Sequence, residues 1–214
     1  MSRKRFLYLM LSRTATGMGK IIRLFTHYEY NHVSLTLDPT FQHWVSFARY
    51  VQGVPLAGGF VMETARRFRS MEGPIPVKIF RIELCESCYQ QLVHLFAMAG
   101  SQDSGLIYNT LGALATVVGC RFPLPGAYTC LDFAGTILGR PFKSIRDLDE
   151  TMENRIIYQG DLKALLYDNQ DDDTYFTKRG FRGGTWDTAV HFTRLMNRFI
   201  HRSNYLDPLS KYWS

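Results

Sequence analysis

The strongest constraint on this chain lies between residues 121 and 141, where a stretch that breaks regular structure runs directly into an apolar helical pattern. Pro123, Pro125 and Gly126 cannot continue a helix. From residue 131 apolar side chains recur at helical spacing, and Gly-Arg-Pro at 139–141 ends the run. The pattern predicts a short, largely buried helix whose first turn contains Cys130.

The position of Cys130 in that helix bears on its chemistry. A thiol in a first turn meets unpaired backbone N–H groups and the positive end of the helix dipole. Both favour the thiolate, which is the nucleophilic form. The alternative is an inert structural cysteine, because free Cys is among the most buried residue types. A nucleophile requires a base that is close in space, although not in sequence.

His32 is the candidate base. Val33, Leu35 and Leu37 alternate with polar residues, which indicates a strand that begins at His32. A turn at 38–41 and a return strand at 42–48 complete a predicted hairpin. His32 is therefore expected on the polar face, at the start of its strand.

The order of these motifs resembles the circularly permuted papain-like superfamily of the NlpC type, in which the His precedes the Cys. Its relatives include bacterial permuted amidases and peptidases and the lecithin:retinol acyltransferase group. Residues 128–134, Tyr-Thr-Cys-Leu-Asp-Phe-Ala, are similar to the family's nucleophile segment. Residues 20–26 are similar to its helix ahead of the catalytic His, and 158–165 to its closing element. The resemblance covers residues 5 to 166.

The resemblance implies an α+β fold in which a small, bent, barrel-like antiparallel sheet is packed with helices. It implies a thiol amidase or peptidase that cleaves an amide bond in a peptide or N-acyl substrate. Cys130 would carry the acyl group, His32 would act as the base, and no cofactor or metal would be needed. The alternative is a catalytically inactive papain-like module that binds an acyl or peptide ligand.

A third site residue should orient His32, and the family takes it from a strand that follows the His. One hairpin register places Phe47 opposite His32, and a shift by one residue places Ser46 there. The second register matches the apolar faces of the two strands better, so Ser46 is the expected third residue. His43 and Glu63 remain alternatives.

The length of the chain limits how many domains it can form, and its net charge limits which partners it suits. With 214 residues, 46% of them hydrophobic, the chain can form one domain and an extension. We expect a papain-like domain over 1–167, then an acidic linker and an amphipathic helix packed on it over 168–214. A net charge of +6 does not point to nucleic acid, but it is compatible with a membrane surface contacted by that helix. The helix should bury Trp186, Leu195 and Phe199, and the oligomeric state stays open.

The cysteines and the apolar runs indicate a cytoplasmic protein. The four Cys form no dense disulfide framework, and Cys85 and Cys88 are expected to be structural at a helix start. The apolar run at 6–11 is too short for a signal peptide, and no stretch reaches transmembrane length.

The remaining elements follow from periodicity. Strands are expected over 5–11, 60–63 and 77–84, a solvated basic stretch over 64–69, a loop or short helix over 146–153, and helices over 20–26, 86–100, 106–118, 160–167 and 185–202.

Overall fold

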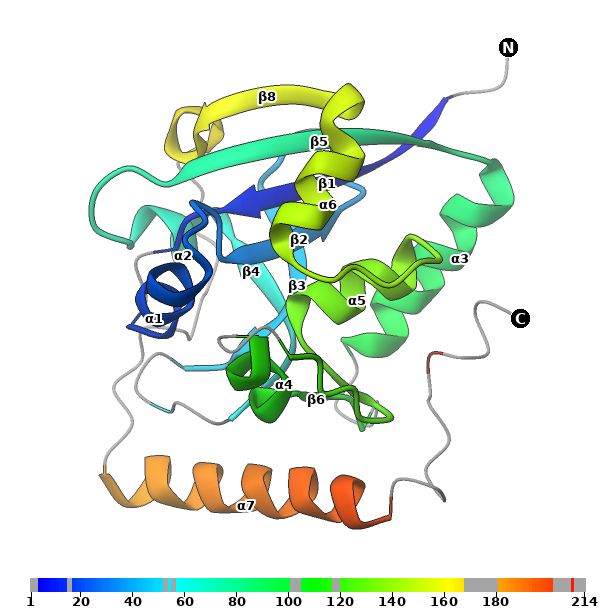
Figure 1. Cartoon of the computed structure of the whole chain (residues 1–214). Coiled ribbons are helices and arrows are strands. Elements are labelled where there is room, and N and C mark those ends of the chain that lie inside the picture. Colours follow the sequence, from blue (N-terminus) through cyan, green and yellow to red (C-terminus); the bar gives the residue numbers. More distant parts are fainter. Residues whose placement is uncertain are drawn as a thin grey trace.

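The computed structural model describes residues 4–14, 17–51, 54, 57–100, 105–116, 120–167, 181–201 and 209. Its centre is a six-stranded sheet of order β4-β3-β2-β1-β5-β8, in which every neighbouring pair is antiparallel (Figure 1). The strands are β1 (Arg5–Ser12), β2 (His32–Thr36), β3 (His43–Arg49), β4 (Gly58–Thr64), β5 (Pro76–Leu84) and β8 (Ile156–Asp161). Two short strands, β6 (Ile107–Tyr108) and β7 (Ala127–Tyr128), form a separate parallel pair.

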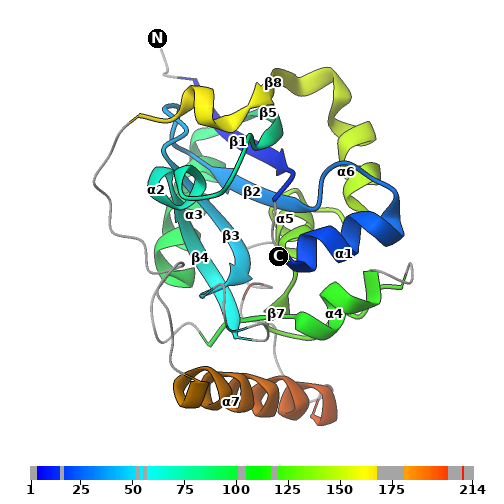
Figure 2. The same cartoon turned by 90° about the vertical axis from the view of Figure 1, so that its left-hand side faces the viewer.

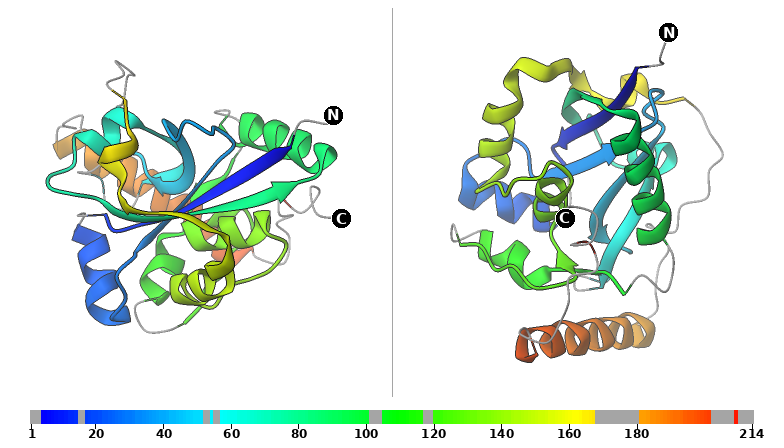
Figure 3. Two further views of the ribbon diagram at one scale, coloured as in Figure 1. Left: turned by 90° about the horizontal axis from the view of Figure 1, so that it is seen from above. Right: turned by 90° about the vertical axis from the view of Figure 1, so that its right-hand side faces the viewer.

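Helices cover both faces of the large sheet and therefore create two hydrophobic cores. The described α-helices are α1 (Gly17–Thr26), α2 (Ala65–Arg69), α3 (Glu86–Ala99), α4 (Thr110–Ala115), α5 (Cys130–Ile137), α6 (Ile145–Met152) and α7 (Phe181–Ile200). The larger core joins apolar side chains of α3, α5 and α6 to one sheet face, and the smaller core joins α2 to the other. The view from above shows α5 and α6 on one side of the strands and α2 on the other (Figure 3). The expected α+β class is confirmed.

The predicted helix over 160–167 is wrong, and the predicted helix over 106–118 is right only in part. Residues 160–167 complete the edge strand β8 and then form a 3-10 turn at Leu162–Leu165. That strand pairs with β5, and Val77 lies opposite Gly160. The predicted helix over 106–118 begins only at Thr110, because Asn109 accepts a hydrogen bond from the backbone N–H of Gly112 and so caps α4.

The basic stretch 64–69 is only in part the solvated face that its charge predicted, because Arg66 and Arg69 are exposed but Arg67 is buried. Thr64 caps a short helix, α2, by accepting the backbone N–H of Arg67. Phe68 is fully buried in the smaller core, and the Arg67 side chain is only 5% exposed. The Glu63 carboxylate, 3.9 Å from Arg67 Nη2, and the Arg49 carbonyl, to which Arg67 donates, hold this guanidinium inward.

The C-terminal helix α7 packs against the rest of the chain through one narrow face. Leu195 is buried, His191 donates a hydrogen bond to the Tyr108 carbonyl, and Arg198 donates to the Gly126 carbonyl. Burial is confirmed for Leu195 but is wrong for Trp186 and Phe199, which are 71% and 45% exposed. The docking face follows His191, Leu195 and Arg198, and Trp186 projects away from it.

Figures 1 and 2 show α7 alongside α4 and the β6–β7 pair, at the end of the molecule opposite β8. The predicted acidic linker at 168–174 lies outside the described residues. Within the described part of the chain, no helix combines the length and apolar character needed to cross a membrane.

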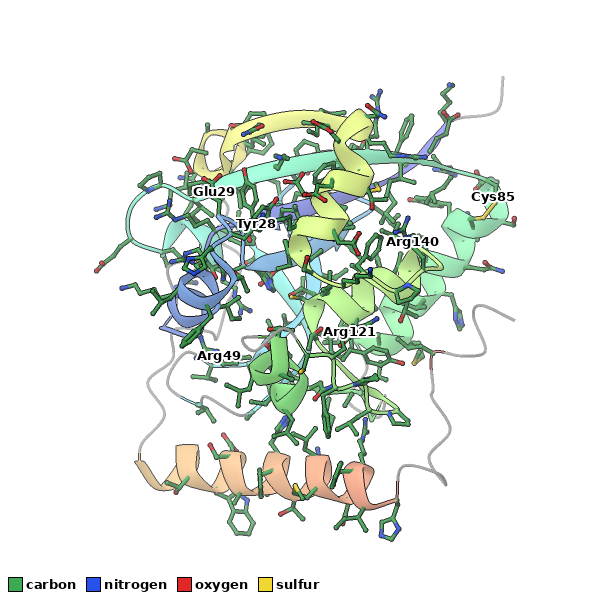
Figure 4. The ribbon with its side chains drawn as sticks, viewed as in Figure 1. Tyr28, Glu29, Arg49, Cys85, Arg121 and Arg140 are labelled. Atoms are coloured by element: carbon green, nitrogen blue, oxygen red, sulfur yellow. A yellow bond between two sulfur atoms is a disulfide. The ribbon has the colours of Figure 1, made fainter. Side chains whose placement is uncertain are left out.

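The Cys85-Glu-Ser-Cys88 motif lies at the start of α3, as expected, and Cys85 caps the helix. The Cys85 sulfur accepts the backbone N–H of Cys88, and the two cysteines are joined by a disulfide. In Figure 4, Cys85 lies at the outer end of α3, far from α1 and α4. The pair therefore takes no part in the site built around Cys130.

Candidate active site

Cys130 is the first residue of α5, as the sequence predicts. Thr129 caps the helix: its hydroxyl accepts the Asp132 backbone N–H, and Asp132 in turn accepts the backbone N–H of Thr129. This capping box satisfies the third helical N–H and leaves the Cys130 N–H without a partner inside the helix. The half-buried thiol thus sits at the positive end of the helix, beside a backbone N–H that the helix itself does not use.

Aromatic packing fixes the position of α5 against the sheet. The Phe47 ring on β3 lies 5.1 Å from the Tyr128 ring and 5.0 Å from the Phe133 ring, on either side of Cys130 in sequence. All three side chains are buried in the larger core. The chain reaches this position through Gly126, whose φ of +65° favours glycine. The apolar pattern that predicted the helix therefore also anchors the nucleophile.

A buried polar network holds the loop that precedes His32. The Asn31 amide accepts the Thr14 backbone N–H at 3.0 Å and donates to the Thr14 hydroxyl at 2.7 Å. Arg23 on α1 donates to the same Asn31 oxygen at 2.6 Å. A Cβ on Gly19 would lie 2.4 Å from the Asn31 amide nitrogen, so only glycine allows α1 to approach this closely. β2 consequently begins at a fixed point, with His32 as its first residue.

Glu63 on β4 binds the His32 ring. His32 Nε2 donates to the Glu63 carboxylate, 3.0 Å from Oε1 and 3.2 Å from Oε2. Ser34 donates to the Glu63 Oε2 at 2.5 Å, and Arg67 Nη2 lies 3.9 Å from Oε1. The side chains of His32 and Glu63 are only 11% and 3% exposed. A buried carboxylate with these partners fixes both the orientation and the tautomer of the imidazole.

The electrostatics of the site favour a charged imidazole. Burial lowers the pKa of His32, but the Glu63 carboxylate and the hydrogen bond between the Cys130 and His32 side chains outweigh it and raise that pKa to about 10. Burial likewise opposes ionisation of Glu63, yet the charges of His32 and Arg67 lower its pKa to about 2. Because Glu63 occupies Nε2, Nδ1 is the ring nitrogen that remains for the thiol.

Ser46, the expected third residue, does not hold the His32 ring. Leu35 lies opposite Val45. The expected register, which pairs His32 with Ser46, is therefore wrong by two residues. Ser46 is consequently level with Ser34 rather than with His32. Its hydroxyl is fully buried and has no hydrogen-bond partner among the described residues. The apolar faces were matched correctly, because a shift of two residues leaves Val45 and Phe47 on the same side as Leu35.

Of the other two candidates for the third residue, only Glu63 lies beside the His32 ring. His43 faces the hairpin turn, where its Nδ1 lies 3.6 Å from an Asp38 carboxylate oxygen. Glu63 is the residue that bonds to His32. It reaches the ring from beyond β3, since β4 follows β3 in the sheet and Glu63 lies opposite Trp44.

A cavity of about 330 Å³ connects the site to solvent. His32, Glu63 and Cys130 line it together with apolar side chains of α1, β3 and α5. Tyr108 also lines it, and burial, together with the nearby Cys130, raises the pKa of the Tyr108 hydroxyl. The cavity is therefore large enough for an extended small ligand to lie against the Cys130 sulfur.

Sequence reasoning missed Ser34 and Arg67 as parts of the site. Ser34 had a usable signal, because residues two apart on a strand share a face and His32 is two positions away. Arg67 had only a weak one: it stands four residues after Glu63, but its basic stretch is typical of a solvated surface.

Comparisons with family models, curated proteins and solved structures give no match for this chain. Within the described ranges, the His, Cys, Asp and Glu side chains form no group of three that could hold a metal ion.

Proposed function

We propose that this protein is a cysteine hydrolase that cleaves an amide bond in a peptide or N-acyl substrate through an acyl-enzyme on Cys130. One observation supports the proposal above the others: His32 lies between the buried Glu63 carboxylate and the Cys130 thiol, in an open cavity. Nucleophile, base and orienting carboxylate in this order match the general pattern of an activated cysteine.

The first half-reaction transfers the acyl group to the enzyme. His32 Nδ1 takes the thiol proton, and the Cys130 thiolate forms a C–S bond to the substrate carbonyl carbon. The Cys130 backbone N–H, in the first turn of α5, would stabilise the oxyanion. As the C–N bond breaks, the His32 imidazolium returns the proton to the leaving amine, and a thioester remains.

The second half-reaction frees the enzyme. A water molecule loses its proton to His32 and attacks the thioester carbon, which releases the carboxylic acid and the Cys130 thiol. Glu63 stays ionised throughout and holds the imidazolium, as its low pKa indicates. Ser34 donates to Glu63 and so helps to position it.

We also propose the permuted papain-like architecture, with the sheet bent around α5. In its support, His32 at the start of β2 precedes Cys130 at the start of α5, and α5 packs on β2 and β3. This order of base and nucleophile is the one that the sequence resemblance implies.

Trapping the acyl-enzyme tests the proposal. The protein is incubated with p-nitrophenyl esters of short and medium-chain acids, and acylated peptides are identified by mass spectrometry. We expect the acyl group on Cys130 in the wild type and in Cys120→Ala, and its loss in Cys130→Ala and His32→Ala. An adduct that forms equally well in His32→Ala would overturn the proposal in favour of a ligand-binding module.

A further inference from the structure

The cavity that holds Cys130 has an unbalanced set of charged side chains. Arg49, Arg67, Lys143 and Arg146 line it, and among the described lining residues Glu63 is the only carboxylate. Glu63 is already engaged by the His32 imidazolium at 3.0 Å. A bound molecule therefore meets an excess of positive charge next to the nucleophile.

Two of these cations lie close to the reacting residues. Arg67 Nη2 is 3.9 Å from the Glu63 carboxylate and donates to the Arg49 carbonyl at 3.3 Å, so the two arginines are neighbours. Arg49 is the last residue of β3 and lies just past the point where β3 runs beside His32. In Figure 4, Arg49 lies between α1 and α4.

An independent electrostatic observation links Arg49 to the nucleophile. Burial raises the pKa of Tyr108, the charges of Cys130 and Asp132 act in the same direction, and the charge of Arg49 opposes them. The charges of Cys130 and Arg49 thus both act on one phenol within the same cavity. Lys143 and Arg146 lie further out, where both residues are exposed, and the Arg146 guanidinium stacks on Tyr28 at 5.1 Å.

A guanidinium presents a planar fork of N–H donors that matches a carboxylate, and among the described residues four cations line this cavity with one carboxylate that His32 already engages. From these observations we infer that the cavity takes a substrate with a carboxylate close to the scissile amide, and that Arg49 and Arg67 bind that carboxylate. An N-acyl amino acid or a peptide with a free carboxylate near the cleaved bond has this chemistry. The inference rests on the proposed function and adds the substrate class to it.

Two alkylating reagents of nearly equal size test the inference. Iodoacetate carries a carboxylate where iodoacetamide carries a neutral amide, and both form the same type of thioether with Cys130. The measured quantity is the ratio of their alkylation rates at Cys130, followed by mass spectrometry. Arg49→Gln should lower the ratio of iodoacetate to iodoacetamide by about three- to tenfold, because it removes one charge close to the thiol.

Three matched measurements make the result specific. Arg49→Lys keeps the charge and should retain most of the wild-type ratio. Arg81→Gln makes the same charge change on β5, outside the cavity lining, and should leave the ratio unchanged. Added salt should lower the wild-type ratio, a readout that needs no variant to fold.

A ratio that is the same in the wild type, Arg49→Gln and Arg67→Met, and that does not respond to salt, would overturn the inference and leave the hydrolase proposal intact. If instead His32→Ala does not slow alkylation by iodoacetamide, the proposed function itself fails. The two failures are therefore distinguishable in one set of measurements.

Discussion

Glu63 on β4 accepts a hydrogen bond from His32 on β2 at 3.0 Å, across the intervening strand β3. The same carboxylate accepts the Ser34 hydroxyl at 2.5 Å. Two residues 31 positions apart are thus joined on one face of the sheet, next to the helix that starts with Cys130.

Glu63→Gln should leave His32 in place but remove the charge that stabilises its imidazolium. We expect the pKa of His32 to fall from about 10 towards its ordinary value of 6.5. In a triad, loss of the orienting carboxylate can cost up to about 10⁴-fold in turnover. NMR titration of the His32 ring in both proteins measures the shift, and equal titration curves would contradict it.

Ser34→Ala and Ser46→Ala form a matched pair that separates the observed site from the expected one. Ser34→Ala removes a hydrogen bond to Glu63 and should slow alkylation of Cys130. Ser46→Ala removes a buried hydroxyl that has no partner among the described residues, so the alkylation rate should not change. Its free energy of unfolding should stay constant or rise by up to about 1 kcal/mol. A slower reaction in Ser46→Ala alone would restore Ser46 as the orienting residue.

Stability should depend on pH at both ends of the range. The raised pKa of His32 contributes stability that is complete below about pH 6.5 and is lost as the pH rises through about 10. The lowered pKa of Glu63 contributes stability that is present above about pH 4.5 and is lost as the pH falls towards 2. Urea unfolding across this range should show both slopes, and His32→Gln should remove the alkaline contribution of His32.

Leu195 and Trp186 test how α7 is held. Leu195 is 1% exposed, and its replacement by Ala should lower the free energy of unfolding by about 2–5 kcal/mol, or release α7 while the rest stays folded. Trp186 is 71% exposed, so Trp186→Ala should change stability by no more than about 0.5 kcal/mol. Chemical denaturation with limited proteolysis measures both effects. A large loss in Trp186→Ala would show that this exposed face has a partner.

Patterns that depend on local periodicity predicted much of the fold. The alternation after His32, the helical spacing after Cys130 and the breaking residues before it place the two candidate catalytic residues in their elements. The edge strand β8 was missed because pairing with β5, a long-range contact, decides it. Tertiary packing likewise overrides the preference of Arg67 for solvent.

The third site residue shows where sequence reasoning stops. The faces of β2 and β3 were matched correctly, but a register shift of two residues leaves every side chain on its expected face. Hydrophobic patterning therefore cannot select among such registers, and Ser46 was preferred over Glu63. Only the pairing of Leu35 with Val45, and the place of β4 beside β3, bring Glu63 to His32.

The most direct test of the triad compares the two free thiols, Cys120 and Cys130. Cys120 is exposed and Cys130 is half-buried, so accessibility alone favours reaction at Cys120. If His32 activates Cys130, iodoacetamide at pH 7 should modify Cys130 first, and His32→Ala should slow that reaction without affecting Cys120. Faster reaction at Cys120 in the wild type, or an unchanged Cys130 rate in His32→Ala, would contradict the proposed triad.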